Sequence, residues 1–334
     1  MRCRFRLVAL VLPVALFACR STPPQPLTWA LAIHGGAGTL SRNTPPEKRQ
    51  EYEAALTAAL AHGRDRLAKG DSALDVCEQV VRILEDDPRF NAGKGAVYNE
   101  KGEHELDASI MDGSTLRCGA VAGVRTVKNP VSLARLVMEK TRHVLLMGDG
   151  AEKFADTQNV ERVPNTWFDT EHRKQALEDV LRERAKGLGA AAGPRDVRAT
   201  YGTVGCVALD AQGRLVAATS TGGLTGKRWG RVGDTPVIGA GNYADRTVAV
   251  SCTGTGEQFM RHVVGHTVSS RMQWGGQSLD EAARAVVFGT LQKDDGGLIA
   301  VDRMGNLTAT FNSEGMYRGL ADASGKFIVR IFED

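Results

Sequence analysis

Apolar residues recur along this chain with two spacings, and each spacing predicts one kind of element. A return every three or four residues predicts amphipathic helices at residues 46–67, 71–84 and 130–140. Short apolar runs predict strands at residues 29–33, 106–111, 118–124 and 143–147. Asp71 or Ser72 is the expected N-cap of the second helix, because either side chain can accept a hydrogen bond from a free backbone N–H. The first strand is expected to break at His34, where the glycine-rich sequence HGGAG begins.

The pattern changes in the middle of the chain. Residues 171–200 are charged and then rich in Gly and Ala, which predicts a helix that fades into a flexible linker. Dense strands follow, beginning abruptly at Thr203. Two segments, residues 203–221 and 295–313, share one pattern of an apolar strand, an Asp-x-x-Gly turn and a return strand. Two such hairpins with helices between them predict an α/β (α+β) layered fold, with stacked sheets covered by helices.

The first hairpin should place two threonines side by side. A three-residue turn that ends at Gly213, with this glycine in a left-handed conformation, sets Asp210 opposite Arg214. The same register sets Thr203 opposite Thr221, and the Cβ atoms of such neighbours lie about 4.5–5.5 Å apart. We therefore expect the two hydroxyl groups to be within hydrogen-bonding distance, unless a β-bulge shifts the register by one residue.

The N-terminal residues have the pattern of an export signal. Three arginines in the first six residues precede an apolar run of about 12 residues, too short to cross a bilayer as a helix. We expect residues 1–18 to be a signal peptide and residues 19–28, which include several prolines, to be a tether. Cys19 directly follows Ala18, as in the bacterial lipobox, which predicts a periplasmic protein anchored to the membrane only by a lipid on Cys19. Phe17 is bulkier than that motif usually has, so plain secretion stays open.

Composition and charge remove several classes of function. The chain has 334 residues with 42 Lys+Arg and 39 Asp+Glu, and loss of the three signal arginines brings the formal net charge from +3 to zero. We therefore expect no nucleic-acid partner. No C-x-x-C and no H-E-x-x-H sequence is present, so a zinc site is not predicted. The four cysteines after Cys19 are too few for a disulfide scaffold and are expected to be buried thiols.

Three glycine-rich stretches match known motifs only in part. Residues 34–36 could form the oxyanion loop of an α/β-hydrolase, but no G-x-S-x-G elbow accompanies them. Residues 222–227 lack the first glycine of a P-loop, and residues 254–256 are followed by Phe259 where a dinucleotide fingerprint has glycine or alanine. All three are interpreted as turns.

The junction before the first hairpin is a candidate nucleophile site. Thr203 lies in the sequence GTVG, where the expected linker meets a buried strand. A threonine hydroxyl is a weak nucleophile without a neighbouring base, and its own α-amine, with a pKa of about 7.7–8, can be that base once the Gly202–Thr203 bond is cut. Glycine tolerates the strained conformation in which the Thr203 hydroxyl could attack the Gly202 carbonyl. The pattern alone also fits an ordinary strand start with a structural threonine pair.

Longer motifs resemble those of the plant-type L-asparaginase and isoaspartyl peptidase family of N-terminal nucleophile (Ntn) hydrolases. They are spread over most of the chain, and are HGGAG from His34, FNAGKGAV from Phe90, ELDASIMDG from Glu105, GAVAGV from Gly119, NP from Asn129, GTVG from Gly202, TSTGG from Thr219, GRVGDTPVIGAG from Gly230 and SCTGTGE from Ser251. The resemblance implies an αββα sandwich and cleavage before Thr203. The α subunit would be residues 29–202, with a linker at 171–202, the β subunit residues 203–334, and the assembly (αβ)₂.

The resemblance also implies a role for each matching residue. Thr203 would be the nucleophile, Thr221 would hold its hydroxyl, and Asn91 would position the nucleophile's amine or a water. Thr253 and the Gly254 amide would form the oxyanion hole. The substrate's α-carboxylate and α-amine would be bound by Arg231, Asp234, Gly254 and Gly256, so Gly254 would serve both sets.

No cofactor is implied for catalysis, but the resemblance implies a structural sodium ion. Its ligands would be backbone carbonyls, which leave no side-chain signature in the sequence. They would belong to Leu84, Glu85, Asp87, Phe90, Ala92 and Lys94.

The activity implied is hydrolysis of β-aspartyl amide bonds in isoaspartyl dipeptides and L-asparagine, between which the sequence does not choose. The alternative within the same class is a glycosylasparaginase that hydrolyses N4-glycosyl-asparagine, although there the nucleophile usually follows Asp and here it follows Gly202. A taspase-like endopeptidase is disfavoured, because a clamp on both α-groups excludes a continuing peptide. A non-catalytic exported lipoprotein on an Ntn scaffold is the alternative from another class, and an uncut chain would favour it.

Overall fold

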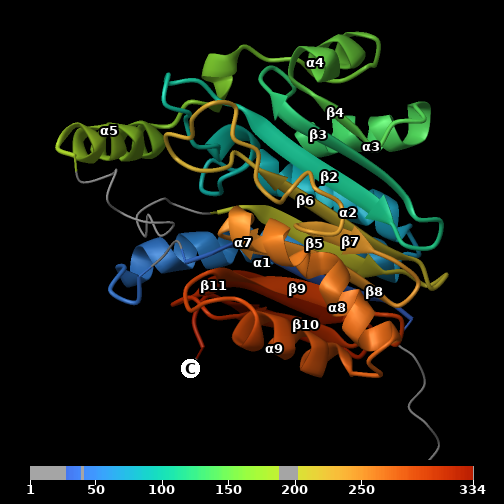
Figure 1. Cartoon of the computed structure of the whole chain (residues 1–334). Helices are drawn as coiled ribbons and strands as arrows, with labels where there is room; N and C mark the ends of the chain where they lie inside the picture. The colour runs from blue at the N-terminus through green and yellow to red at the C-terminus, as the bar shows by residue number, and fades with distance from the viewer. Residues whose placement is uncertain (1–27, 39–40, 188–201, 334) are drawn as a thin grey trace, which may run out of the picture.

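The computed structural model of this protein describes residues 28–38, 41–187 and 202–333 (Figure 1). The predicted signal peptide, Cys19, nearly all of the tether and residues 188–201 of the predicted linker lie outside these residues. Within them no helix is long and apolar enough to span a membrane.

A large sheet of eight strands runs through the middle of the molecule, with the order β12-β11-β1-β5-β6-β2-β3-β4. Its strands are β1 (Ala30–Ala37), β2 (Leu106–Asp112), β3 (Arg117–Val124), β4 (Leu145–Met147), β5 (Val204–Leu209), β6 (Leu215–Thr221), β11 (Met316–Asp322) and β12 (Phe327–Arg330). Neighbouring strands are antiparallel, except β3 and β4, which are parallel. The strands predicted at 106–111 and 118–124 are confirmed, and the one predicted at 143–147 is shorter.

The first strand differs from its prediction. It does not break at His34 but continues through the glycines to Ala37, still paired with β11. A register shift between His34 and Gly36 absorbs the irregular backbone, as a β-bulge does.

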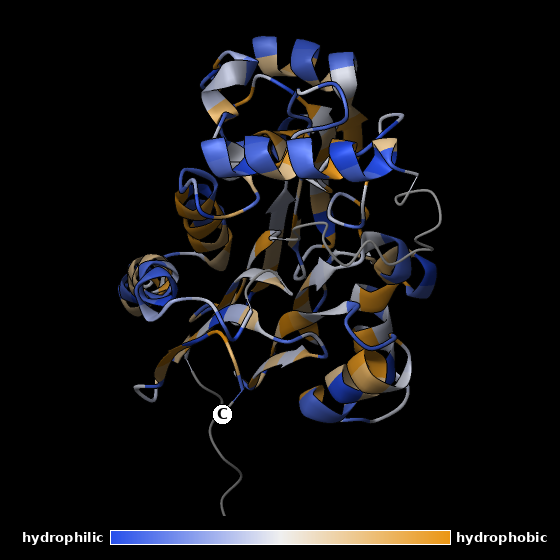
Figure 2. Ribbon diagram, turned by 90° about the vertical axis from the view of Figure 1, so that its left-hand side faces the viewer, coloured by the Kyte–Doolittle hydropathy of each residue, from blue (hydrophilic) through white to orange (hydrophobic). Residues whose placement is uncertain are grey.

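A second sheet has four antiparallel strands in the order β10-β9-β8-β7 and faces the first sheet. Its strands are β7 (Asn242–Ala244), β8 (Val248–Gly254), β9 (Gly296–Asp302) and β10 (Leu307–Phe311). Side chains such as Met111, Val207 and Ile299 fill the space between the sheets. Figure 2 shows hydrophobic residues gathered on the strands and on the helix faces that meet them, with hydrophilic residues turned outward.

Helices cover the outer face of each sheet (Figure 1). Those on the large sheet are α1 (Pro46–Ala68), α2 (Ala73–Glu85), α3 (Pro130–Lys140) and α4 (Gly148–Asp156). Those on the small sheet are α7 (Gly256–His262), α8 (Val264–Gln273) and α9 (Leu279–Gly289). The molecule is therefore a mixed α/β structure in which helices flank a large mixed sheet and its smaller partner sheet.

The predicted helices at 46–67, 71–84 and 130–140 are confirmed. Ser72 is the N-cap of α2, and its side chain accepts the N–H of Asp75 at 3.1 Å. A helix was also expected from residue 171, and α5 (Glu171–Ala185) lies there. The helix α4 was not predicted. Of the four cysteines, which form no disulfide within the described residues, three are buried as expected and Cys118 is partly exposed.

The register of the first hairpin is the predicted one. The N–H of Asp210 bonds the carbonyl of Arg214 at 3.1 Å, and Gly213 has a φ of 75°. The strand pairs then run without a bulge from Leu209 opposite Leu215 to the pair next to Thr203 and Thr221.

Candidate active site

The hydroxyl groups of Thr203 and Thr221 meet at the open end of the first hairpin. Thr203 lies just before β5, and its Oγ1 donates to Thr221 Oγ1 at 3.0 Å. The N–H of Gly223 donates to the same Thr221 oxygen at 3.0 Å. The Thr221 hydroxyl is thus fixed by backbone on one side and faces the candidate nucleophile on the other.

Backbone and side-chain donors hold both carbonyls at the Gly202–Thr203 junction. The Gly202 oxygen accepts the N–H of Asn91 at 3.1 Å, and the Thr203 oxygen accepts His34 Nδ1 at 3.0 Å. No room is left for side chains here, because a Cβ on Gly36 would lie 2.5 Å from Gly202 Cα, and a Cβ on Gly202 would lie 2.8 Å from that of Asn91. The carbonyl that Thr203 would attack is therefore tightly placed and polarised by a donor.

Asn91 ties this junction to the end of β6. Its Nδ2 donates to the Gly223 carbonyl at 2.8 Å, and its Oδ1 accepts the N–H of Val97 at 2.9 Å. Its backbone carbonyl accepts the N–H of Gly222 at 3.0 Å. Since Asn91 is fully buried and its amide group is engaged at both ends, it fixes the two segments that carry the threonines.

Thr253 points toward the same end of the sheets. Ser251 and Thr253 lie on one side of β8, as alternation requires, and Ser251 Oγ is 2.7 Å from Thr219 Oγ1 on β6. Two residues further along each strand, Thr253 follows Ser251 on β8 and Thr221 follows Thr219 on β6. Thr253 Oγ1 is buried and has no hydrogen-bond partner within the described part of the chain. A buried hydroxyl group without a partner is what a site that donates to a bound ligand would show.

The two strands run in the same direction, which is what brings these threonines to one end. Ala249 on β8 pairs with Ala244, whose N–H contacts Met111, and Met111 lies opposite Ala217 on β6. Gly254 follows with a φ of 149°, where a Cβ would overlap the Asp295 carbonyl, so only glycine fits here.

Arg231 and Asp234 carry opposite charges, and both pack against Gly256, where no side chain fits. A Cβ on Gly256 would lie 2.8 Å from Arg231 Nη2 and 2.8 Å from Asp234 Oδ1. Asp234 is buried, and its Oδ2 has no partner among the described residues. Burial raises the pKa of Asp234 to about 7, although Arg231 opposes the shift. Oδ2 of this carboxylate lacks a donor, which a substrate amine would supply.

Sequence reasoning missed Glu257, although it ends the quoted motif SCTGTGE. Its carboxylate accepts Arg231 Nε at 2.9 Å and Nη2 at 3.0 Å. Burial lowers the pKa of Arg231, but its bonds to Glu257 and the attraction of Asp234 outweigh this, so the net shift is upward.

A buried polar chain behind the nucleophile was also missed. His34 Nε2 is 2.9 Å from Ser251 Oγ, and this serine bonds Thr219. Burial lowers the pKa of His34 to about 3, so the ring is neutral, and donation from Nδ1 to the Thr203 carbonyl leaves Nε2 as an acceptor. The chain joins the two sheets directly below Thr203.

The loop after α2 fits a cation held by carbonyl oxygens. A Cβ on Gly93 would overlap the Glu85 carbonyl, and one on Gly95 would overlap the Phe90 carbonyl, so two glycines leave a cradle around these oxygens. The Glu85 carboxyl accepts Ser220 Oγ at 2.7 Å and Val131 N at 3.0 Å, and burial raises its pKa to about 8. The described residues contain no cluster of three His, Cys, Asp or Glu side chains that could hold a metal.

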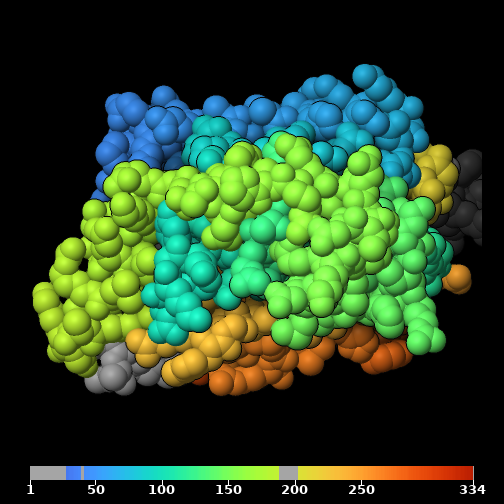
Figure 3. All heavy atoms as spheres, turned by 90° about the horizontal axis from the view of Figure 1, so that it is seen from above, coloured from blue at the N-terminus to red at the C-terminus, as the bar shows by residue number. Residues whose placement is uncertain are grey.

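The loop that follows β6 carries Arg231. Figure 3 shows this loop beside the segment near residue 100 and next to α5. Asn99 forms a bridge with Lys227, and Arg184 donates to the Gly226 carbonyl at 2.8 Å. A cavity of about 200 Å³ opens behind Arg231 and is lined by Asp107 and Lys227.

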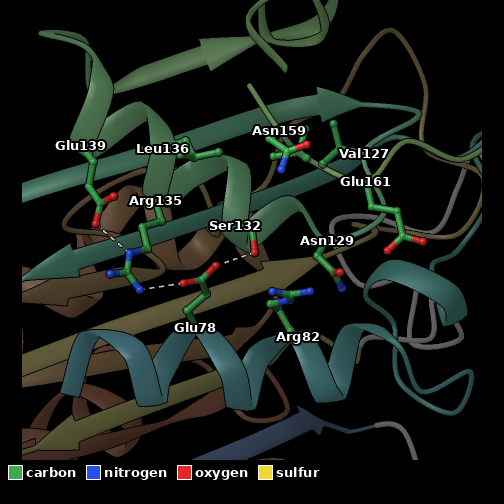
Figure 4. Close-up of a pocket in the computed structure, with 11 residues that line it drawn as sticks. Glu78, Arg82, Val127, Asn129, Ser132, Arg135, Leu136, Glu139, Asn159 and Glu161 are labelled. Carbon is green, nitrogen blue, oxygen red and sulfur yellow. Dashed lines mark hydrogen bonds and ion pairs between the residues drawn. The ribbon is translucent and has the colours of Figure 1, made fainter. Parts of the chain in front are cut away.

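A separate cavity of about 260 Å³ lies between α2 and α3 (Figure 4). Arg135 dominates it and is paired with Glu78, Glu139 and Asp75 at 2.7–2.8 Å. None of the predicted catalytic or substrate-binding residues lines this cavity, which belongs to an ion-pair network between the helices.

Comparison with known proteins gives consistent matches over most of the chain. Residues 27–331 match the sequence model of the asparaginase family. The isoaspartyl peptidase of Salmonella typhimurium is 51% identical over 295 residues, which covers 86% of this chain and 93% of the relative. The isoaspartyl peptidase of Escherichia coli (strain K12) is 50% identical over 292 residues, with 86% and 91% covered. A probable isoaspartyl peptidase/L-asparaginase 2 of Arabidopsis thaliana is 44% identical over 324 residues, with 91% and 99% covered.

Proposed function

This chain belongs to the asparaginase family, and from that premise we propose that it is an isoaspartyl peptidase/L-asparaginase, an enzyme that hydrolyses β-aspartyl amide bonds in isoaspartyl dipeptides and L-asparagine. The observation that carries the proposal is the pair of hydroxyl groups of Thr203 and Thr221, 3.0 Å apart. They lie near Arg231, whose Nη1 is 3.6 Å from the position that a Cβ on Gly223 would occupy, and the N–H of Gly223 bonds Thr221 Oγ1.

The first proposed step is cleavage of the chain, as in an αββα Ntn hydrolase. Thr203 Oγ1 attacks the carbonyl carbon of Gly202, and the N–H of Asn91, 3.1 Å from the Gly202 oxygen, stabilises the developing negative charge. The peptide nitrogen leaves as the amine of Thr203, and water hydrolyses the resulting ester. An α subunit then ends at Gly202, and a β subunit begins at Thr203 with a free amine.

That amine is the base for the hydrolytic cycle. It takes the proton of Thr203 Oγ1, which attacks the β-carbonyl carbon of the substrate, while the Thr221 hydroxyl orients the nucleophile. Thr253 Oγ1 and the Gly254 N–H stabilise the oxyanion. The leaving amine takes the proton back, and water releases aspartate from the ester.

Substrate selection rests on the charged pair. Arg231 binds the α-carboxylate and Asp234 binds the α-amine, and Gly256, which has no side chain, lets both side chains pack close to its backbone. An α-linked aspartyl peptide has no free α-carboxylate and would leave Arg231 unpaired, so we expect at least ~10³-fold preference for β-Asp-Leu over α-Asp-Leu. Arg231→Lys, which loses the planar fork, should raise KM and leave chain cleavage intact.

A sodium ion, when bound, would supply structural support to the loop that carries Asn91. The carbonyls that would hold it are those of the residues named above, Leu84, Glu85, Asp87, Phe90, Ala92 and Lys94. The cradle at Gly93 and Gly95 supports this part of the proposal.

Export, anchoring and assembly complete the proposal. Residues 1–18 would be a signal peptide, and Cys19 would carry the lipid that holds the enzyme at a periplasmic membrane surface. Only the N-terminal sequence pattern supports this step. The cleaved subunits would assemble as (αβ)₂.

The decisive experiment combines one gel with a substrate panel. Purified mature protein should give two fragments, the second with Thr203 at its N-terminus. It should hydrolyse L-asparagine or β-Asp-Leu in preference to N-acetylglucosaminyl-asparagine. An uncut chain with full activity would exclude the mechanism, and an uncut inactive chain would favour a binding protein.

A further inference from the structure

The guanidinium group of Arg231 has two edges that can each bind a carboxylate, and one is already taken. Glu257 accepts bonds from Nε at 2.9 Å and from Nη2 at 3.0 Å, the paired geometry that a planar fork favours. The Arg231 side chain is 18% exposed and that of Glu257 is 39% exposed, so the pair lies at the rim of the site. Burial raises the pKa of Glu257, but Arg231 lowers it by more, which keeps this carboxylate charged at neutral pH.

The other edge lies near the glycine that bonds Thr221, the partner of the candidate nucleophile. Arg231 Nη1 is 3.6 Å from the position that a Cβ on Gly223 would occupy, and the N–H of Gly223 bonds Thr221 Oγ1. Nη2 and Asp234 Oδ1 each lie 2.8 Å from the position that a Cβ on Gly256 would occupy. Three glycines therefore surround this edge, since a Cβ on Gly233 would lie 2.8 Å from Nη1.

We infer that Glu257 is the positioning residue that holds Arg231 for the substrate's α-carboxylate, and that it thereby sets the requirement for a free α-carboxylate. This inference rests on the proposed function and assigns a further residue to it. A guanidinium bonded along its Nε–Nη2 edge cannot turn about its last side-chain bonds, so the Nη1–Nη2 edge is in place before the substrate arrives. Ordering the group in advance removes part of the entropy cost of binding.

This arrangement has an electrostatic cost that makes the role testable. Two carboxylates on one guanidinium repel each other, so a residue that served only to add charge would not lie here. Glu257 thus orients the Arg231 guanidinium, but its own charge weakens the attraction between Arg231 and the substrate's α-carboxylate. Loss of Glu257 should therefore weaken the binding of substrates that have an α-carboxylate. It should leave unchanged the binding of a substrate in which an amide replaces this carboxylate.

The test uses the cleaved enzyme with L-asparagine and with its α-amide. Glu257→Gln keeps the shape and one acceptor, and should raise KM for L-asparagine about tenfold, while Glu257→Ala should raise it about 10- to 100-fold. Values of kcat should stay within about threefold, because Glu257 does not touch the reacting atoms. The KM of the α-amide should not change, so the preference for the free carboxylate should fall by the same factors.

Glu100→Gln is the matched control. Glu100 forms an ion pair at 3.1 Å with Arg228, which lies in the same loop as Arg231, and it forms no ion pair with Arg231 itself. This variant should therefore behave as wild type with both substrates. Fragments cut before Thr203 report that each variant has folded. Unchanged KM for L-asparagine in both Glu257 variants, or equal losses with the two substrates, would overturn the inference. A wild-type enzyme that is uncut and inactive would instead count against the proposed function.

Discussion

The two hairpins of this chain, residues 203–221 and 295–313, are nearly identical at their turns. Asp210 Oδ1 accepts the N–H groups of the residues two and four positions on, both at 3.0 Å, and Asp302 Oδ1 does the same at 2.8 and 2.9 Å. Gly213 and Gly305 follow with φ of 75° and 83°. Each turn fixes the register of its strands, one in each sheet, by the same local chemistry.

Their open ends differ. In the second hairpin, Asn312 closes the end by accepting the N–H of Gly296 at 3.1 Å and donating to the Val287 and Gln292 carbonyls at 2.8 Å. In the first, Thr203 and Thr221 bond each other, and Thr253 Oγ1, toward the same end of the sheets, is buried without a partner among the described residues. The turn therefore determines which residues lie opposite each other. Polar groups without hydrogen-bond partners at the open end determine whether these residues can act on a substrate.

The largest expected difference between the hairpins comes from removing one hydroxyl at each open end. Thr203→Ala should stay a single chain and lose at least ~10⁴-fold in kcat, because no other group replaces the nucleophile. Ser313→Ala, at the corresponding end of the second hairpin, should be cut and active. Intact-mass spectra and turnover of β-Asp-Leu measure both. A cleaved, active Thr203→Ala enzyme would show that the hairpins do not differ in the way argued here.

A smaller effect is expected from the threonine that orients the nucleophile. Thr221→Val keeps the shape but removes the hydroxyl, so cleavage and turnover should each slow by about 10²-fold. Thr310→Val is the control, since Thr310 is also a buried strand threonine bonded to another threonine, Thr308, at 2.9 Å. Rates of cleavage and hydrolysis in time courses should fall only for the first variant. Equal slowing in both would mean that any buried hydroxyl on these sheets matters to the same degree.

The contrast also explains what the sequence could predict. The hairpin register and the Thr203–Thr221 contact were predicted correctly because both depend on a turn only a few residues long. The course of β1 through the glycines was predicted wrongly, because its pairing with β11 comes from residues almost 300 positions away. The bonds of His34 to Ser251 and of Arg231 to Glu257 were not predicted either. The first depends on how the two sheets stack, and the second on how the loop after β6 meets the start of α7, and no local pattern encodes these arrangements.

The pH dependence of KM tests the role of Asp234 at the open end of the first hairpin. Its pKa, raised to about 7 by burial, means that the carboxyl is neutral in acid and cannot pair with a substrate ammonium. KM for β-Asp-Leu should therefore fall as pH rises through about 7, and rise about tenfold per unit on the acid side. Asp234→Asn should have a high KM without this transition. A wild-type KM that is flat between pH 5.5 and 8.5 would contradict the assignment of Asp234 to the amine.

The smallest expected effect tests the likeness of the turns themselves. Gly213→Ala and Gly305→Ala each place a Cβ on a residue with positive φ, which costs about 1–2 kcal/mol in the free energy of unfolding. No atom lies within 4 Å of a Cβ at Gly213, so strain in the backbone is the whole effect there. The two losses should match within about 0.5 kcal/mol in denaturant titrations. kcat should stay at the wild-type value in both, because the register is also held by ladder bonds along each hairpin. If Gly213→Ala alone slowed cleavage before Thr203, the first turn would be coupled to the open end, and turn and chemistry could no longer be treated as separate parts of the hairpin.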